Sequence, residues 1–231
     1  MSKSVTLSSM ITQVREAADM VGSSFATDIE ITTLLNAYVA ELYDLLVAAY
    51  GPAFYASSYT FNTVSGQREY ALPTSPSTGC DLYQLLGVDI SLGDDEVITA
   101  TPFDFNSRNR FSSSTSWVRS QPVYYRVHGS YIWLIPAPSG VYSVTIHHIP
   151  AAPTLASGGI TSFDGINGWE RYAIVSAAIA LLQKEESDPS VLMAEKASLT
   201  RRIQTMSKNR DAAYPDQIVR VRGRQRRVVD A

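Results

Sequence analysis

The spacing of apolar residues changes twice along this chain of 231 residues, and those changes limit the folds it can adopt. Across residues 31–49 apolar side chains recur every three or four positions, for about five helical turns. Thr27 and Glu30 precede this run with the spacing of a capping box, and Gly51-Pro52 follows it. A shorter run of the same kind covers residues 9–21, so the N-terminal part is predicted to form two helices.

Strand-like sequence follows, in which tyrosine, valine, threonine and isoleucine alternate between short turns. Residues 59–64 and 68–72 flank Ser-Gly-Gln and are predicted to form a β-hairpin. Residues 122–128 and 130–135 flank a second tight turn, and the aperiodic stretch 107–117 is expected to be a loop. Further strands are expected at residues 82–90, 96–100 and 142–149. Neighbouring strands joined by short turns favour an antiparallel sheet or a small barrel.

Helical spacing returns near residue 167 and again after Asp188-Pro189, where the proline suits the first helical position. The predicted fold is therefore α+β, in which two N-terminal and two C-terminal helices form a bundle and an antiparallel β-sheet or barrel is inserted between them. An extended C-terminal tail follows the last helix. The expected divisions are an N-terminal helical hairpin, a β region, the C-terminal helices and a basic tail, at residues 1–53, 54–153, 154–211 and 212–231.

Composition indicates a globular chain, because 45% of its residues are hydrophobic and 18% are charged. The single cysteine, Cys80, excludes an intramolecular disulfide framework and a site with several thiolate ligands. No run approaches the roughly 18 consecutive apolar residues that a membrane helix needs, and the first ten residues lack the apolar core of a signal peptide. We therefore expect a soluble protein of the reducing cytosol, without a membrane partner.

Catalytic and cofactor motifs are not evident in the sequence. His147 and His148 are adjacent in a predicted strand, so their side chains should point to opposite faces and not share one metal. Residues 94–96 are three consecutive acids without the alternating spacing of a calcium loop. The chain also lacks a nucleophile elbow, a phosphate-binding glycine loop and a zinc-protease motif. We expect no cofactor, no metal and no enzymatic activity.

The charge of the chain is divided unequally between its two parts. Residues 196–231 contain ten basic and three acidic side chains, whereas residues 1–195 contain nine basic and nineteen acidic ones. Such asymmetry indicates an interaction tail on an acidic body. The arginines alternate with other residues and would share one face of an extended strand, suited to a protein partner: Arg220, Arg222, Arg224 and Arg226. Nucleic acid is the alternative partner, and a solvated end without a partner is the simplest interpretation.

The many tyrosines of the β region allow a further interpretation, a stacking platform for single-stranded nucleic acid. Such a platform needs basic neighbours, and few lie in that region: Arg68, Arg108, Arg110, Arg119 and Arg126. Aromatic strands packed for sheet stability, or exposed at a protein interface, fit the sequence better.

The order of these parts, with several phrases, resembles the head-to-tail adaptor (connector) proteins of tailed bacteriophages. The phrases are FNTVSGQREYALP (61–73), LLGVDI (85–90), PFDFNSRNRF (102–111), YRVHGSYIWLIPAP (125–138) and the stretch 163–203, which begins FDGINGWERYAIV. The architecture is also similar to that of the tail tubular protein of short-tailed phages. The phrases are structural and include no catalytic signature.

The resemblance implies a ring, commonly of twelve copies, beneath the phage portal at the capsid vertex. Such a ring extends the channel for duplex DNA, which passes without sequence-specific binding, and docks the next tail or nozzle protein. The ring would be a component of the virion and would be assembled in the host cytoplasm. The acidic body is expected to help DNA slide through the lumen rather than bind there.

The predicted interaction residues fall into three groups. The tail residues expected to bind the portal are Val219, Arg220, Val221, Arg222, Arg224, Arg226, Arg227, Val228 and Val229. The apolar helix residues expected at the interface between subunits are Leu34, Tyr38, Leu42, Leu45, Leu192, Leu199 and Ile203. The loop residues expected to face downstream tail proteins are Arg108, Arg110, Phe111 and Trp117.

Overall fold

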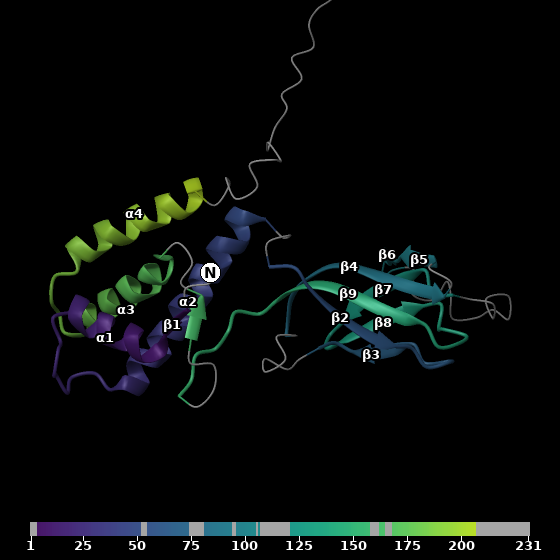
Figure 1. Cartoon of the computed structure of the whole chain (residues 1–231), viewed down its shortest axis with the longest axis horizontal. Coiled ribbons are helices and arrows are strands. Elements are labelled where there is room, and N and C mark those ends of the chain that lie inside the picture. Colours follow the sequence, from purple (N-terminus) through teal and green to yellow (C-terminus); the bar gives the residue numbers. More distant parts are fainter. Residues whose placement is uncertain are drawn as a thin grey trace, which may run out of the picture.

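The computed structural model shows an elongated molecule with a helical part at one end and a β part at the other (Figure 1). This confirms the predicted α+β class, with helices from both ends of the chain meeting in one bundle and strands inserted between them. The structure describes residues 4–51, 55–73, 81–93, 96–104, 106, 121–157, 162–164 and 168–206.

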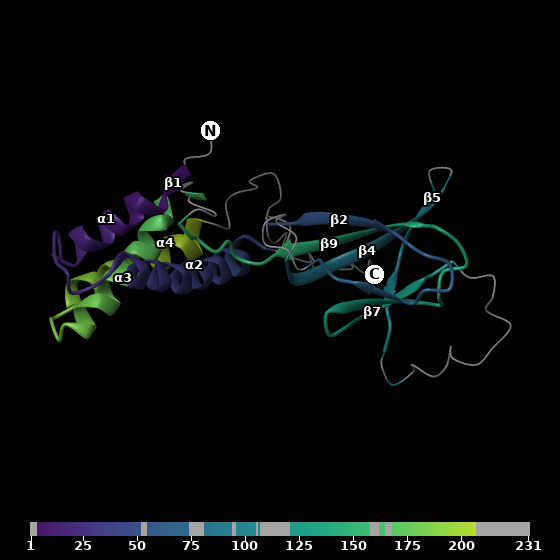
Figure 2. The same ribbon diagram turned by 90° about the horizontal axis from the view of Figure 1, so that it is seen from below.

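The helical part contains α1 (Leu7–Ala17), α2 (Asp28–Tyr50), α3 (Glu170–Lys184) and α4 (Ser190–Met206). α3 packs against the other three helices and is apolar around most of its circumference. A helix that is hydrophobic on all sides must be covered on all sides. Accordingly, α4 lies on one side of α3, and α1 with the first half of α2 lies on the other (Figures 1 and 2).

The start of α2 forms as predicted in one respect and differs in another. The Thr27 hydroxyl accepts a hydrogen bond from the Glu30 backbone N–H, as an N-cap residue should. The Glu30 carboxylate does not complete a capping box but accepts a hydrogen bond from Lys184 Nζ on α3, at 2.6 Å. Glu30 thus links the first turn of α2 to the last turn of α3.

Among the described residues, α2 is the one helix whose length and mean hydropathy, 1.3, would allow it to cross a membrane. Its inner face is buried in the helical core at Ile31, Leu35, Val39 and Leu42. This burial explains the high hydropathy, because a core helix needs the same apolar residues.

The β part is a sandwich of two four-stranded sheets. One sheet has the order β2 (Ser57–Asn62), β9 (Ser143–Pro150), β4 (Leu82–Gly93) and β5 (Glu96–Thr99). The other has the order β3 (Glu69–Ala71), β8 (Tyr131–Ile135), β7 (Tyr124–His128) and β6 (Thr101–Pro102). Apolar residues of both sheets form one core, so the sheets pack face to face (Figure 2). Among the strands that the structure describes, every pair is antiparallel except β6 with β7.

The first predicted hairpin is wrong, and the second is confirmed. β2 pairs with β9 and β3 pairs with β8, so the intervening turn carries the chain from one sheet to the other. Tyr70 holds this turn, because its hydroxyl donates to the Gln67 carbonyl at 2.9 Å and accepts from the Val64 N–H at 3.0 Å. β7 and β8 form the expected antiparallel hairpin, in which Gly129 has φ +59°.

Two short strands outside the sandwich were not predicted from the sequence. β1 (Ser4–Thr6) pairs antiparallel with β10 (Ser162–Asp164), beside the helices. Each has three residues, which is too short for an alternating pattern to be recognised.

Polar contacts from α2 hold the segment that leaves the β part. Asn36 donates to the Leu155 carbonyl at 2.8 Å and accepts from the Leu155 N–H at 2.7 Å. The Tyr43 hydroxyl donates to the Pro150 carbonyl at 2.7 Å, and Tyr83 of β4 donates to Asp44. The two parts are therefore joined by directed hydrogen bonds as well as by the chain itself.

Replacing Asn36 by alanine should destabilise the protein by about 2–4 kcal/mol. The change removes both hydrogen bonds to the backbone of Leu155. Because Leu155 is only 1% exposed, its N–H and carbonyl groups would be left unpaired next to the core, which costs stability. Chemical denaturation followed by circular dichroism measures the loss. Asn62→Ala, at the exposed end of β2, is the matched control and should change stability by less than about 0.5 kcal/mol. Equal effects of the two variants would contradict the assigned role of Asn36.

Replacing His148 by leucine should stabilise the β part by about 1–2 kcal/mol. The side chain is fully buried, and neither ring nitrogen has a hydrogen-bond partner. An unsatisfied buried polar group costs stability that an apolar group of similar size does not. Thermal unfolding measures the change. His147→Leu is the control, since it removes a partly exposed contact with Asp89 at 2.9 Å and should lower stability by at most about 1 kcal/mol. A destabilised His148→Leu protein would disprove this account.

Candidate interaction surfaces

Two of the three predicted groups of interaction residues lie outside the described residues. These are the portal-binding residues of the tail (Val219, Arg220, Val221, Arg222, Arg224, Arg226, Arg227, Val228 and Val229) and the loop residues Arg108, Arg110, Phe111 and Trp117. Their roles remain predictions.

The seven residues predicted at the interface between subunits lie on α2 and α4. Leu42 and Ile203 are fully buried in the helical core of this chain. The other five are partly buried and pack against the same core: Leu34, Tyr38, Leu45, Leu192 and Leu199. The apolar stripes of α2 and α4 are thus largely covered within one chain, and contact of the partly exposed members with a neighbouring subunit stays a prediction.

A charged and aromatic cluster connects α2, α3 and α4. Lys196 Nζ lies 3.2 Å from Glu41 Oε1 and stands over the rings of Tyr38 and Tyr172, at 5.2 and 5.0 Å from their centroids. The Tyr172 hydroxyl donates a hydrogen bond to the same carboxylate. Burial raises the pKa of Tyr172, and the hydrogen bond to the Glu41 carboxylate raises it further.

The Lys196 cluster borders a shallow groove of about 430 Å³ between these three helices. Its other lining residues are Ile179, Gln183, Met193, Ala197 and Thr200. The ammonium group contacts a carboxylate and two ring faces, so its position is determined by the fold. This cluster secures the outer helix α4 to the bundle.

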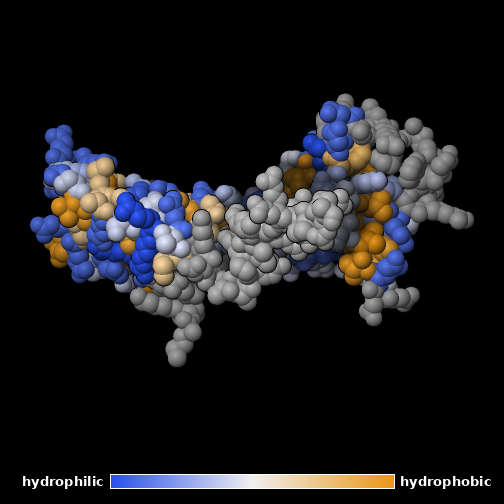
Figure 3. All heavy atoms as spheres, turned by 90° about the horizontal axis from the view of Figure 1, so that it is seen from above, coloured by the Kyte–Doolittle hydropathy of each residue, from blue (hydrophilic) through white to orange (hydrophobic). Residues whose placement is uncertain are grey.

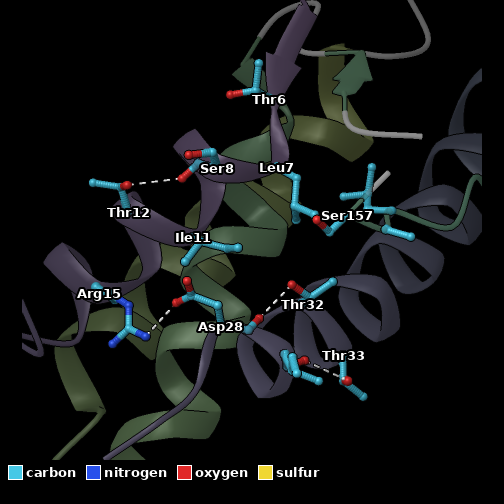
Figure 4. Close-up of a pocket in the computed structure, with 13 residues that line it drawn as sticks. Thr6, Leu7, Ser8, Ile11, Thr12, Arg15, Asp28, Thr32, Thr33 and Ser157 are labelled. Atoms are coloured by element: carbon cyan, nitrogen blue, oxygen red, sulfur yellow. Dashed lines mark hydrogen bonds and ion pairs between the residues drawn. The ribbon is translucent and has the colours of Figure 1, made fainter. Parts of the chain in front are cut away.

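A larger groove, of about 910 Å³, separates α1 from α2 (Figure 4). It opens between the first turns of both helices and the segment 155–157. Its polar side chains are mostly hydroxyls, and several already donate to their own helix: Thr12 to the Ser8 carbonyl, Thr32 to the Asp28 carbonyl and Thr33 to the Ile29 carbonyl.

One end of the α1–α2 groove is closed by Arg15. Its guanidinium donates to the carbonyls of Ser23 and Ala26 at 3.0 and 2.8 Å and pairs with the Asp28 carboxylate at 2.7 Å (Figure 4). These bonds hold the α1–α2 connection against the helices. Ile29, on the opposite side of α2 from its buried stripe, is 80% exposed at the rim.

The α1–α2 groove was not predicted from the sequence. The available signals were the threonines and serines spaced four apart on α1 and the position of Ile29 off the apolar stripe of α2. Both signals describe one helix at a time, whereas a groove depends on how two helices are placed.

The outer face of the β3-β8-β7-β6 sheet carries aromatic and basic residues. The Arg68 guanidinium stands over the Trp133 ring at 4.5 Å, and His128 stacks on Trp133 with ring centroids 4.4 Å apart. Arg126 donates to the Phe103 carbonyl at 2.9 Å. The structure thus brings Arg68 and Arg126 closer to aromatic residues than expected, but both are engaged in contacts within the sheet.

The outer face of the other sheet is polar and neutral for the most part. Thr60 and Thr145 are hydrogen-bonded at 3.0 Å, and Asp89 accepts from Thr99 and contacts His147. His147 and His148 point to opposite faces of β9, as predicted. Among the described residues, no group of three or more histidine, cysteine, aspartate or glutamate side chains has the arrangement of a metal site.

Alkaline pH should weaken the folded state through Tyr172. In the unfolded chain a tyrosine loses its proton near pH 10, whereas the raised pKa keeps Tyr172 protonated in the fold. This contribution to stability is therefore complete below about pH 10 and is lost as the pH rises above it. Denaturant unfolding between about pH 8 and pH 11 should show a steeper decline in the unmodified protein than in Tyr172→Phe.

Glu41→Gln is the matched variant for this pH dependence. Glutamine retains an acceptor for the Tyr172 hydroxyl and removes the negative charge, so the decline should be intermediate between the other two proteins. Identical declines in all three proteins would rule out the contribution of Tyr172.

Comparison with known protein families identifies the family of this chain. A family model described as SU10 adaptor protein matches residues 5–225, which is nearly the whole chain. No curated protein matches the chain. The match covers both helical segments, the β part and most of the tail, and it confirms the resemblance to phage head-to-tail adaptors. The chain belongs to the SU10 adaptor protein family, and it is a phage adaptor of the head-to-tail junction.

Proposed function

We propose that this adaptor forms a ring beneath the phage portal, extends the channel for duplex DNA and docks the downstream tail or nozzle protein. The observation that carries the proposal is the family match over residues 5–225. The elongated architecture supports it, because an adaptor needs separate surfaces for the proteins on its two sides (Figure 1). The ring assembles in the host cytoplasm before it becomes part of the virion.

The basic tail is the portal-binding element of this proposal. Five arginines fall between residues 220 and 231, on a chain whose first 195 residues carry excess negative charge. An extended strand with arginines on one face would add backbone hydrogen bonds to a sheet edge and charge-assisted bonds to carboxylates. From residue 212 to 231 the tail would reach about 66 Å at about 3.3 Å per residue.

The β part is proposed to face the downstream tail protein, together with the loop that contains Arg108, Arg110, Phe111 and Trp117. Exposed Tyr131 and the stacked Arg68, Trp133 and His128 belong to the same part of the molecule. Aromatic and arginine side chains are common at protein interfaces, which supports docking to a protein.

A nucleic-acid-binding module is the alternative function, and the five arginines are the observation that favours it. Binding of this kind arises from phosphate contacts and falls steeply as salt increases. Its dependence on salt separates it from docking to the portal.

Removing the tail after Tyr214 should reduce binding to assembled portal at least about tenfold, because the arginine-bearing strand is lost. Pull-downs of the full-length and truncated proteins with portal, and with duplex DNA at low and high salt, measure the effect. A variant with residues 215–231 in scrambled order is the matched control, since it keeps the charge and loses the alternation.

The two functions differ in the outcome of this experiment. Docking to the portal requires that truncation and scrambling both abolish portal binding, with negligible DNA binding at physiological salt. In the other case truncation leaves portal binding intact and removes only salt-sensitive DNA binding, and the scrambled variant still binds DNA. The arginines would then bind DNA, and the proposal that the tail binds the portal would be wrong.

A further inference from the structure

A ring built from identical subunits requires two different complementary surfaces on opposite sides of each subunit. The apolar stripes of α2 and α4 are largely used inside the chain, so the ring contact must involve faces that turn away from α3. Two such faces of the described helical part differ in shape and charge.

The first face is the α1–α2 groove of about 910 Å³. Thr12, Thr32 and Thr33 donate their hydroxyl protons to their own helices, so their methyl groups add to the apolar surface of Ile11 and Leu155. Ile29 is 80% exposed at the rim, although a large apolar side chain stabilises a protein mainly when it is buried. The groove is therefore suited to an apolar or small-residue ridge.

The second face is the outer surface of α4. Its buried stripe contains Ile203, and small residues occupy the opposite side at Ser190, Ala194 and Ser198, all of them exposed. Small side chains allow another element to approach the helix axis closely. Val191 flanks this ridge and is 79% exposed. Figure 3, viewed from the α4 side, shows hydrophilic residues with separate apolar patches over the helical part.

These two faces lie on opposite sides of α3. α4 lies above α3 in Figure 1, whereas α1 and the first half of α2 lie below it. In Figure 2, seen from below, α1 and α2 stand to either side, so the groove between them faces away from α4. A ridge on one side and a groove on the other is the arrangement that a head-to-tail ring contact needs.

The charges of the two faces are also complementary. Residues 4–36, which include the groove, contain one basic and four acidic side chains: Arg15, Glu16, Asp19, Asp28 and Glu30. α4 contains one acidic side chain, Glu195, and three basic ones, Lys196, Arg201 and Arg202. Several of these charges are paired within the chain: Asp28 with Arg15, Glu30 with Lys184, Lys196 with Glu41 and Glu195 with Arg171. The difference in charge therefore rests on Glu16 and Asp19 on the side of the groove and on Arg201 and Arg202 on α4. Opposite charges favour contact between these faces and disfavour contact of either face with itself.

We propose that the outer face of α4, with its Ala194–Ser198 ridge and Arg201, packs into the α1–α2 groove of the neighbouring subunit. This inference rests on the proposed ring and names the surfaces that close it. The occupant of the groove is a second copy of this chain, and the contact repeats around the ring.

Crosslinking tests the contact directly. In a Cys80→Ser background, Ile29→Cys places a thiol on the groove rim and Ser198→Cys places one on the α4 ridge. With a flexible bis-maleimide and portal present, the double variant should give a ladder of covalent multimers. Each single variant should give mainly uncrosslinked chain, because a head-to-tail contact brings unlike surfaces together.

Disruptive variants supply an independent measurement. Ile29→Lys places a positive charge on the groove rim, opposite the basic α4 face, and Arg201→Glu reverses the charge of that face; both residues are exposed, so folding should be unchanged. Each variant should lower the ring population by at least about tenfold in mass photometry with portal. Val141→Glu, at a position that is 73% exposed in the β part, is the matched control and should form rings normally.

The outcomes separate the inference from the proposed function. If the unmodified protein forms no ring with portal, the ring itself fails, and this contact fails with it. If rings form but the double-cysteine variant gives no ladder and both Ile29→Lys and Arg201→Glu assemble normally, the ring stands and the contact is wrong. If Ile29→Cys alone or Ser198→Cys alone is crosslinked as readily as the double variant, like surfaces meet in the ring, which also overturns the inference.

Discussion

The burial of α3 is the constraint on which the rest of the structure depends. Its residues from Tyr172 to Leu181 are almost all inaccessible to water, so this helix has no face that can remain exposed. The described helical part contains three other helices, and all three pack against it. Because α1 and α2 precede the β part and α4 follows α3, the chain must return from the sandwich to complete the helical core.

Three helices around a fourth do not enclose it evenly, and this explains where the surfaces arise. The wider gap, between α1 and α2, forms the larger groove, and the gap between α2 and α4 forms the smaller one beside Lys196. The sandwich is attached to the second half of α2 through Tyr43 and Asp44, and Asn36 holds Leu155 of the segment that leaves the sandwich. The helical part and the β part therefore lie at opposite ends of an elongated adaptor, and each part has its own hydrophobic core.

Errors in prediction from the sequence share a physical cause. The segments 59–64 and 68–72 have the local pattern of a hairpin, yet β2 and β3 pair with strands that are distant in sequence. Glu30 has the spacing of a capping box, but its carboxylate pairs with Lys184, 154 positions away. In each case the local pattern predicted an interaction partner nearby in the sequence, whereas the partner in the folded chain is distant in the sequence. The β7–β8 hairpin was predicted correctly because its partners are adjacent.

The sequence by itself determined the helices, most strands, the α+β class and the adaptor family, because periodicity, turn residues and characteristic phrases are local properties. It also determined the basic tail, since charge can be counted without a fold. Only the tertiary structure decided what covers each apolar face: Leu42 and Ile203 lie in the core of their own chain. A stripe of apolar residues shows that a helix face is buried, but not whether the same chain or a neighbouring subunit covers it. For the same reason the groove beside Ile29 became visible only when α1 and α2 were placed together.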